Sequence, residues 1–379
     1  DPKSVRVYNG GPLVVNGKVI MGAGGCAAGG MNISQSCFVS AHDLETGKEL
    51  WRFNTLAQPG EPGDETWNNV PAEKRWGGSV WITPSYDPEL NLLYVGTGTP
   101  YPWSSITRGT YQPAGGGNRG DGLYMNSTLA FNPDTGKLVW YYQHLPNDTY
   151  DQDYAFERII APITFQGAKR KAVITAGKPG VIEALDAKTG QFLAATDPGM
   201  QNIFTFDPKT GVKTLLPPVL PEGVKRCPGN NGARNHMPGA YDPTTNRYYI
   251  SMWDLCTGKG GETPDRMLGL DLDTMEFAVD VKARELQSTG KMTTAGGLLF
   301  SAAGDRYFRA FDSRDGKVLW QTRVQDVPNG SPVSYMVDGK QYLALIAGNP
   351  GINGNGAARA TSENIRPDGN VVLWVWQLP

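Results

Sequence analysis

The sequence predicts an all-β protein, a β-propeller made of four-stranded antiparallel blades. Three observations support this prediction. A turn motif recurs five times along the 379 residues, and no stretch shows the 3.6-residue period of a helix longer than a few turns. The chain also contains 48 Gly, 28 Pro, 10 Trp and 16 Tyr residues, a composition that indicates many tight turns between short strands. Short strands repeated at this spacing are typical of propeller blades.

The repeated motif reads Asp-x-x-Thr-Gly-x-x-x-Trp and predicts a β-hairpin. The Asp side chain accepts hydrogen bonds from nearby backbone N–H groups, and the Gly takes a positive φ. A second strand then runs out through the Trp. With the strand residues that lead into them, the copies cover residues 41–51, 130–140, 184–193, 269–274 and 310–320, and their mean spacing is about 67 residues. The copy at 184–193 has no Trp, and the copy at 269–274 is degenerate.

Further strands are expected before each copy and at the end of the chain. Residues 12–20 form one hairpin with a two-residue turn at Asn16-Gly17. Residues 370–379 are expected to form a final closing strand. Long loops at 100–123 and 216–235 explain the uneven spacing. We expect the periodic Trp residues to pack between neighbouring blades.

Charge and hydropathy exclude several classes of partner. The chain has 35 Lys and Arg against 37 Asp and Glu, and this near-neutral balance argues against a nucleic-acid or anionic-membrane partner. No apolar run is long enough to cross a bilayer. No signal peptide is present, because the chain begins at Asp1-Pro2-Lys3. A processed, secreted protein would look the same.

The four cysteines are Cys26, Cys37, Cys227 and Cys256. No Cys-x-x-Cys or Cys-x-x-Cys-His occurs, so the sequence encodes neither a zinc ribbon nor covalently attached haem. Two disulfides formed in an oxidising compartment are the favoured interpretation, and free buried thiols are the alternative. Cys26 and Cys37 bracket a short Gly-rich loop, which a local disulfide would hold.

The repeat alone leaves two kinds of function open. One is a structural propeller that serves as a scaffold, and the other is an enzyme with a central cofactor. No Gly-x-Ser-x-Gly nucleophile motif is present. His42, His144 and His236 do not share a spacing that would suit a metal triad.

The repeats resemble those of the quinoprotein alcohol dehydrogenases, which bind pyrroloquinoline quinone (PQQ) on the axis of an eight-bladed propeller. The resemblance covers nearly the whole chain. Five turn motifs and a closing strand make five to six blades. The resemblance to an eight-bladed family therefore implies that residues 1–379 are a single propeller domain lacking two to three N-terminal blades. We expect another segment or chain to complete the ring, because open sheet edges are unstable. A genuine six-bladed propeller is the alternative.

The resemblance assigns cofactor-binding roles near the start of the chain. In the segment from Gly78 to Pro88, Trp81 matches the residue on which PQQ stacks, and a flat quinone needs such an aromatic face. Ser79 and the backbone around Gly25 and Cys26 would orient the cofactor. An ordinary Trp between blades is the alternative reading of Trp81.

Two acids are the candidate catalytic and metal-binding groups. In the segment from Leu145 to Tyr154, Asp151 matches the family's catalytic Asp, a base for the alcohol proton. Asp153 resembles the second carboxylate of the lanthanide-using branch, because a larger ion of higher charge needs more anionic ligands. A turn with two solvated acids is the alternative.

A lysine and an asparagine complete the implied cofactor site. Lys178 follows a predicted strand and matches the cation that binds the quinone oxygen, although a solvent-facing turn lysine is the other reading. Asn235 matches a cofactor-contacting Asn. It lies between Cys227 and Cys256, which match a disulfide of the family. His236 is a candidate for lining the substrate pocket.

The chain departs from the family pattern at the metal. Ala27 stands where the family has a Glu ligand, and Thr99 stands where it has an Asn ligand. The expected ligands of a calcium or lanthanide ion are therefore Asp151, Asp153 and Thr99. Ser288 lies about where the family has a Trp that covers the quinone, so a wider pocket is expected.

The resemblance thus implies a periplasmic oxidoreductase that moves hydride from an alcohol, polyol or sugar to PQQ. Electrons would pass to a separate cytochrome c, because no haem motif is present. The alternative is a non-catalytic propeller, a scaffold or binding module. A second chain that supplies the missing blades and a homodimer are both open possibilities.

Overall fold

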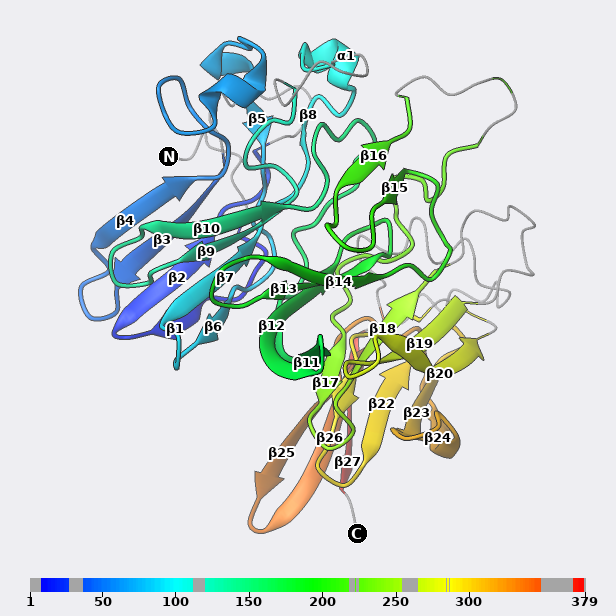
Figure 1. Cartoon of the computed structure of the whole chain (residues 1–379). Coiled ribbons are helices and arrows are strands. Elements are labelled where there is room, and N and C mark those ends of the chain that lie inside the picture. Colours follow the sequence, from blue (N-terminus) through cyan, green and yellow to red (C-terminus); the bar gives the residue numbers. More distant parts are fainter. Residues whose placement is uncertain are drawn as a thin grey trace. The chain divides into compact units, whose positions relative to one another are not determined.

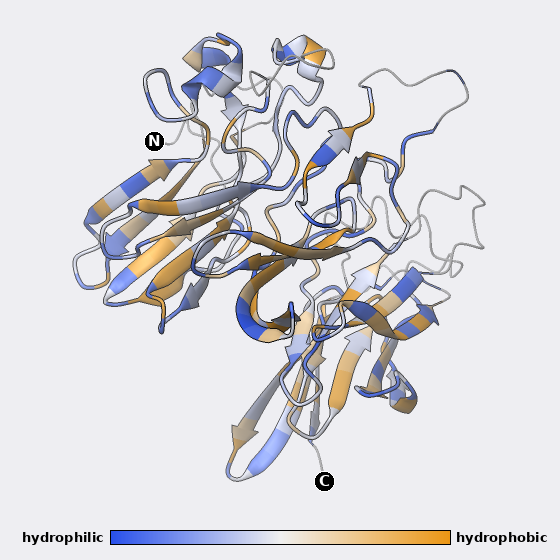
Figure 2. Cartoon of the chain, viewed as in Figure 1, coloured by the Kyte–Doolittle hydropathy of each residue, from blue (hydrophilic) through white to orange (hydrophobic). Residues whose placement is uncertain are grey.

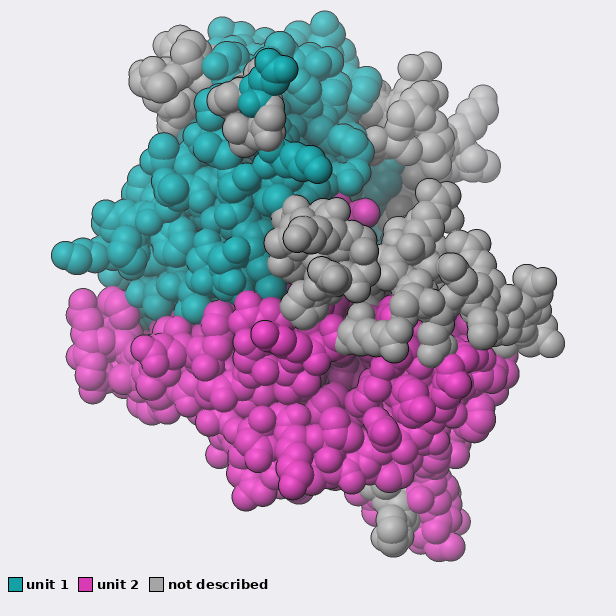
Figure 3. All heavy atoms as spheres, turned by 90° about the vertical axis from the view of Figure 1, so that its right-hand side faces the viewer, with its two compact units in different colours: residues 1–160, 171–230 teal, residues 161–170, 231–379 magenta. Residues whose placement is uncertain are grey.

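The computed structural model describes residues 8–26, 37–111, 120–217, 222, 225–253, 265–283, 285, 287–348 and 371–377. Small antiparallel sheets follow one another along the chain (Figure 1). The chain divides into two compact units, residues 1–160 with 171–230 and residues 161–170 with 231–379 (Figure 3). The described part of the chain contains no helix with the length and apolar character that a membrane crossing requires.

Three four-stranded sheets make up the body of the first unit. The first has the order β1-β2-β3-β4 and consists of β1 (Leu13–Val15), β2 (Lys18–Gly22), β3 (Phe38–Asp43) and β4 (Glu49–Asn54). The second has the order β10-β9-β7-β6 and consists of β6 (Ser85–Asp87), β7 (Leu92–Gly96), β9 (Ser127–Phe131) and β10 (Leu138–Gln143). The third has the order β11-β12-β13-β14 and consists of β11 (Ile159–Phe165), β12 (Ala168–Ala176), β13 (Ile182–Asp186) and β14 (Phe192–Thr196).

Smaller elements in the first unit connect these sheets. They are the pair β5 (Trp76–Gly77) and β8 (Pro100–Tyr101), the pair β15 (Phe204–Phe206) and β16 (Lys213–Leu215), the one-turn helix α1 (Ser105–Arg108), and two 3₁₀ turns at Asp64–Trp67 and Ala72–Lys74.

The second unit contains three sheets. Two have four strands in chain order: β17 (Ala240–Asp242), β18 (Arg247–Met252), β19 (Asp265–Asp271) and β20 (Glu276–Ala283), then β21 (Met292–Thr293), β22 (Leu298–Ala302), β23 (Tyr307–Asp312) and β24 (Val318–Arg323). The last has three described strands, β25 (Val333–Val337), β26 (Lys340–Ala347) and β27 (Val372–Gln377). The prediction of an all-β chain with four-stranded antiparallel sheets is confirmed.

Each predicted turn motif joins the third and fourth strands of its sheet. In the first copy, Asp43 Oδ1 accepts hydrogen bonds from the backbone N–H of Thr46 at 2.8 Å and from its hydroxyl at 2.7 Å. Gly47 then takes φ 70°. A further copy of this turn, which the sequence analysis did not single out, starts at Asp207 and joins β15 to β16.

The core lies on the inner strands of each sheet. Every residue of β7, β9 and β13 is buried, whereas β4 and β24 are largely exposed. Figure 2 shows the same gradient along β12, which changes from hydrophilic at its start to hydrophobic at its end. The inner strands therefore form a firm support for the loops at their ends.

Trp residues of the motif pack against the turn of the following sheet, as the sequence predicted. The Trp51 indole donates to the carbonyl of Pro133 at 2.9 Å, and a Cβ added to Gly136 would lie 2.5 Å from the Trp51 ring. Trp140 repeats this packing against Gly190, where an added Cβ would again lie 2.5 Å from the ring. The motif glycine is thus required both by its φ and by its aromatic neighbour.

We expect Gly190→Ala to destabilise the protein more than Gly47→Ala. Both glycines have a similar positive φ, 74° and 70°, but an added Cβ at Gly47 meets nothing within 4 Å. Left-handed strain should cost Gly47→Ala about 1 kcal/mol, and overlap with Trp140 should add about 1–3 kcal/mol to Gly190→Ala. Urea unfolding monitored by Trp fluorescence measures both costs. Equal costs would show that the packing of Trp140 does not constrain this turn.

Candidate functional site

The loop that carries the predicted acids is built around the buried carboxylate of Asp148. Its Oδ2 accepts hydrogen bonds from the hydroxyl of Thr99 at 2.6 Å and from the side-chain amide of Asn126 at 3.0 Å. Two backbone N–H groups of the same loop also donate to this carboxylate, that of Tyr150 to Oδ1 at 2.8 Å and that of Gln152 to Oδ2 at 2.9 Å. Burial raises the pKa of Asp148, and these bonds oppose that rise. The carboxylate therefore fixes the path of the loop.

This loop brings both predicted acids onto the predicted lysine. The Lys178 Nζ lies 3.1 Å from Asp151 Oδ2 and 2.7 Å from Asp153 Oδ2. The backbone N–H of Lys178 also donates to the carbonyl of Asp153 at 2.9 Å. All three residues are less than 10% exposed. The acids are therefore ion-paired and buried, and the lysine does not face solvent.

Burial and the charges of this cluster shift the pKa values of its side chains. Burial raises the pKa of Asp151 to about 8; the negative charge of Asp153 adds to this rise, and the positive charge of Lys178 opposes it. Burial alone would lower the pKa of Lys178, but the two carboxylates outweigh burial and raise it above its usual range. Asp151 thus holds a proton more readily than an ordinary Asp, while Lys178 stays charged.

The absence of a side chain at Gly98 lets the predicted stacking residue approach the acids. A Cβ added there would lie 2.6 Å from Asp153 Oδ1, 3.3 Å from the carbonyl of Ser79 and 3.5 Å from the Trp81 indole nitrogen. Trp81 is half-buried, and its ring meets the Phe156 ring at 90° with centroids 5.2 Å apart. The first unit therefore brings Trp81 and Ser79 together with the acid–lysine cluster.

A local disulfide lies beside this group. Cys26 and Cys37 are bonded, with Cα atoms 5.5 Å apart, which confirms the predicted pairing. The Cys26 carbonyl accepts a hydrogen bond from the N–H of Gly77, and the Cys37 sulfur lies 3.6 Å from the Ser79 hydroxyl oxygen. Gly25, just before the disulfide, has φ 71°. The disulfide thus anchors the predicted cofactor-contacting backbone to the strand end near Trp81.

Two predicted features lie outside the described residues. They are Ala27, which stands where the family has a Glu ligand, and Cys256. Cys227 is disulfide-bonded, and it lies in the first unit.

The candidate metal ligands form an incomplete set within the described residues. Thr99 directs its hydroxyl to Asp148 and its backbone N–H to Asp153 Oδ1 at 2.9 Å. Asp151 and Asp153 are both paired with Lys178. Across the described ranges, no group of three or more His, Cys, Asp or Glu side chains is placed to hold a metal ion. The described residues thus do not by themselves fit a calcium or lanthanide ion.

Asn235, His236 and Ser288 belong to the second unit. The Asn235 side-chain amide donates to the carbonyl of Asn231 at 3.0 Å, and its oxygen accepts from the N–H of His236 at 2.9 Å. Burial lowers the pKa of His236, and the charge of Arg234 lowers it further. The cofactor contact of Asn235 and the pocket role of His236 stay predictions.

Comparison with known proteins places the chain in a family. Residues 2–197 and 259–343 match the PQQ family, described as the glucose/ethanol/alcohol dehydrogenase β-propeller domain. The chain belongs to this family. Its membership confirms the predicted propeller fold, and the count of eight blades stays a prediction.

Individual members of the PQQ family support this assignment. The chain is 31% identical to quinohemoprotein alcohol dehydrogenase ADH IIB of Pseudomonas putida, over 93% of this chain and 55% of that protein. The crystal structure of quinohemoprotein alcohol dehydrogenase from Comamonas testosteroni superposes with a TM-score of 0.79 at 28% identity, over 90% of this chain and 56% of that one. A europium-containing methanol dehydrogenase shares the fold, with a TM-score of 0.81 at 24% identity, over 98% of this chain and 73% of that one. The chain thus spans about half the length of the curated relatives it matches.

Sequence reasoning missed three residues of this candidate site, Asp148, Gly98 and Tyr101. Burial raises the pKa of Tyr101 to about 12, and the charge of Asp151 adds to the rise, so this phenol lies near the acids. Asp148 precedes Asp151 by three residues, a spacing at which a carboxylate can accept backbone bonds of a turn, and this spacing could have identified it.

We expect Asp148→Ala to destabilise the protein by about 3 kcal/mol or more, because it removes a buried acceptor and leaves its buried donors unpaired. Asp207→Ala is the matched control, since Asp207 accepts two backbone bonds in an exposed turn of the same unit. Its expected cost is about 1 kcal/mol. Urea unfolding of both variants gives the comparison. A similar cost for both would contradict the central role of Asp148.

Proposed function

We propose that the chain contributes the cofactor site of a PQQ-dependent dehydrogenase that oxidises an alcohol, a polyol or a sugar. The observation that supports this proposal is the cluster in which Lys178 lies within 3.1 Å of Asp151 and 2.7 Å of Asp153, at the strand end that Trp81 approaches. A base, a fixed cation and an aromatic surface are what alcohol oxidation by a quinone requires of a protein.

The residues present fit PQQ as the cofactor. Trp81 is half-buried, and its indole would stack with a flat quinone. Lys178 would bind a quinone oxygen, because its charge is held in a buried position by two carboxylates. Ser79 and the backbone at Gly25 and Cys26 would orient the cofactor. Bound PQQ would supply the acceptor for the hydride.

Asp151 is the proposed general base. Its carboxylate accepts the proton of the substrate hydroxyl when the neighbouring C–H bond is broken. Its raised pKa makes it a stronger base than an ordinary Asp. Lys178 holds this carboxylate in place, and Asp153 holds Lys178. Burial of all three residues keeps bulk water away from the exchanging proton.

Asp151 and Asp153 are the proposed metal ligands, with Thr99 beside them, because calcium and lanthanide ions prefer oxygen ligands. These described residues do not form a complete metal site. Lys178 is paired with both acids, so a metal ion would have to compete with its ammonium group.

The electron acceptor and the cellular location are part of the same proposal. The chain contains no Cys-x-x-Cys-His, so we propose that electrons leave to a haem group outside it, such as that of a cytochrome c. The Cys26–Cys37 disulfide supports a periplasmic location, where disulfides persist.

Further blades complete the propeller in this proposal. The last sheet has three described strands, and several of its large apolar residues are exposed, among them Val333, Met336 and Leu373 at 53%, 62% and 62%. Another part of the protein, or a second chain, would cover such a face.

The proposal predicts that Asp151→Asn keeps PQQ binding but lowers kcat by about 10²- to 10⁴-fold, the usual contribution of a general base. The full-length protein is titrated with PQQ in the presence of Ca²⁺ and then of La³⁺, and binding is measured from the absorption of the quinone. Dye reduction with a panel of alcohols, polyols and sugars measures turnover. Asp134→Asn is the control, because it alters an exposed acid paired with Lys18 in the same unit.

Three outcomes are informative. If dye reduction requires a metal, the metal that supports it identifies the ion that the protein uses. Full activity of Asp151→Asn would remove Asp151 as the base. No PQQ binding with either metal would favour the scaffold alternative.

A further inference from the structure

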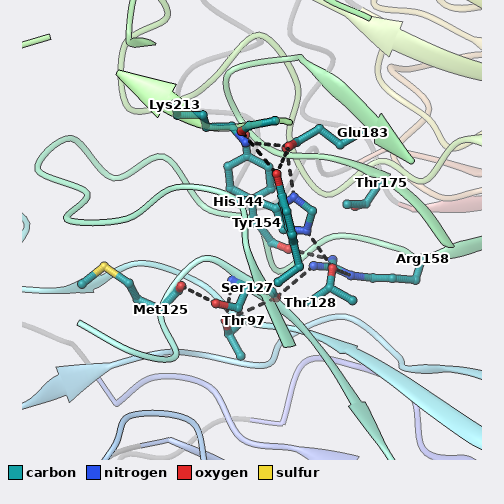
Figure 4. Close-up of polar contacts among 12 residues, drawn as sticks. Thr97, Met125, Ser127, Thr128, His144, Tyr154, Arg158, Thr175, Glu183 and Lys213 are labelled. Atoms are coloured by element: carbon teal, nitrogen blue, oxygen red, sulfur yellow. Dashed lines mark hydrogen bonds and ion pairs between the residues drawn. The ribbon is translucent and has the colours of Figure 1, made fainter. Parts of the chain in front are cut away.

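A buried charge network lies in the first unit beside Tyr154, the residue that follows Asp153 (Figure 4). Glu183 on β13 accepts from the His144 Nδ1 at 2.9 Å and from the Lys213 Nζ at 2.6 Å. The three side chains are at most 3% exposed. His144 follows β10, and Lys213 begins β16, so three separate strands contribute to one network.

The network fixes a single protonation state. Burial alone would raise the pKa of Glu183, but Lys213 and His144 outweigh burial and hold it at about 2. Burial lowers the pKa of His144 to about 4, so the imidazole is neutral at neutral pH. Its Nδ1–H then donates to Glu183, and its Nε2 accepts the hydroxyl proton of Thr128 at 2.7 Å. Both ring nitrogens are engaged, which fixes the plane of the imidazole.

The fixed imidazole is one wall of a slot that holds Tyr154. The two rings are parallel, with a 2° angle between their planes and centroids 4.7 Å apart. The backbone of Gly177 is the other wall, because a Cβ added there would lie 2.5 Å from the Tyr154 ring. The Tyr154 hydroxyl is buried and makes no hydrogen bond to any described residue. The ring is therefore held by its two faces and not by its hydroxyl.

This slot adjoins the acid–lysine cluster on both sides. Tyr154 follows Asp153 directly, and Gly177 precedes Lys178 directly. The two segments are joined by the hydrogen bond from the Lys178 N–H to the Asp153 carbonyl. We propose that Tyr154 is a positioning residue, which fixes the Asp153–Lys178 pair, and that the network of Lys213, Glu183 and His144 holds it in place. The consequence for PQQ rests on the proposed function.

Lys213, the lysine of this network, belongs to the small β15–β16 hairpin. The Lys213 ammonium lies 5.4 Å from the ring centres of both Tyr142 and Phe204, so aromatic faces enclose it. Without this cation, the buried Glu183 carboxylate would keep only the neutral imidazole and the weak 3.4 Å contact of the Tyr142 hydroxyl. Lys213 is thus required for the imidazole wall although it does not touch the acid–lysine cluster.

Two substitutions at Tyr154 separate the ring from the hydroxyl. Tyr154→Phe keeps both stacked faces and removes a hydroxyl that has no described partner, so it should behave as wild type. Tyr154→Leu removes the ring. Hydrogen–deuterium exchange of residues 176–180 in the full-length protein is the readout, because it reports on the bond from the Lys178 N–H. The Asp186 N–H, which donates to the Gln191 carbonyl in the same unit, is the internal reference.

The expected result is selective loss of protection. Exchange of residues 176–180 should rise about tenfold or more relative to the reference in Tyr154→Leu, and should not change in Tyr154→Phe. A merely structural role would raise exchange at both places equally, and that outcome would overturn the proposal. Unchanged exchange in Tyr154→Leu would also overturn it.

Lys213→Met tests the far end of the network, with Lys18→Met as its control. Lys18 forms an ion pair with Asp134 on the surface of the same unit. Lys213→Met should raise exchange of residues 176–180 and weaken PQQ binding about 10- to 100-fold, the usual effect of losing a supporting residue. Lys18→Met should do neither. Equal effects of the two variants would remove Lys213 from the network.

The two proposals can fail separately. If the wild-type protein does not bind PQQ, the proposed function is wrong, and the exchange data still decide whether Tyr154 positions Lys178. If the wild-type protein binds PQQ and Tyr154→Leu binds it equally well, the positioning role is wrong and the proposed function stands.

Discussion

Within the first unit, the arrangement depends on one repeated contact, an aromatic ring lying on a glycine of the next turn. Trp51 lies on Gly136, Trp140 on Gly190, and Phe192 on Gly211. Each glycine has a positive φ and lacks a Cβ, so the turn and the packing of the next sheet are set by one residue. This contact orders successive sheets and so fixes the strand ends from which the functional loops extend.

The functional loops add a second constraint, which is the neutralisation of buried charge. The oxygens of Asp148 accept four hydrogen bonds, Asp151 and Asp153 share Lys178, and Glu183 is paired with Lys213 and His144. Buried charges are costly unless they are paired, so each group restricts the backbone that carries its partner. The site is rigid because its charges leave few alternative arrangements.

Much of this could be predicted from the sequence, because the signals are local. The turn repeats predicted the sheets, and the spacing of Cys26 and Cys37 predicted their disulfide. Asp151 and Lys178 were predicted from a family pattern, and the structure brings them together. The roles of Gly98 and Tyr154 could not be predicted, because each depends on a contact between segments distant in sequence. The turn at Asp207 carries the same local signal as the others and was overlooked.

The position of Lys213 has a consequence for protein engineering. The β15–β16 hairpin resembles a surface insertion that could be exchanged between homologous enzymes to alter their properties. Its second strand, however, begins with Lys213, the counter-ion of the buried Glu183. A chimaera that takes the hairpin from a donor without a cation at this position would inherit an unpaired anion inside the recipient. Successful grafting would therefore require transferring Glu183 and His144 together with the hairpin.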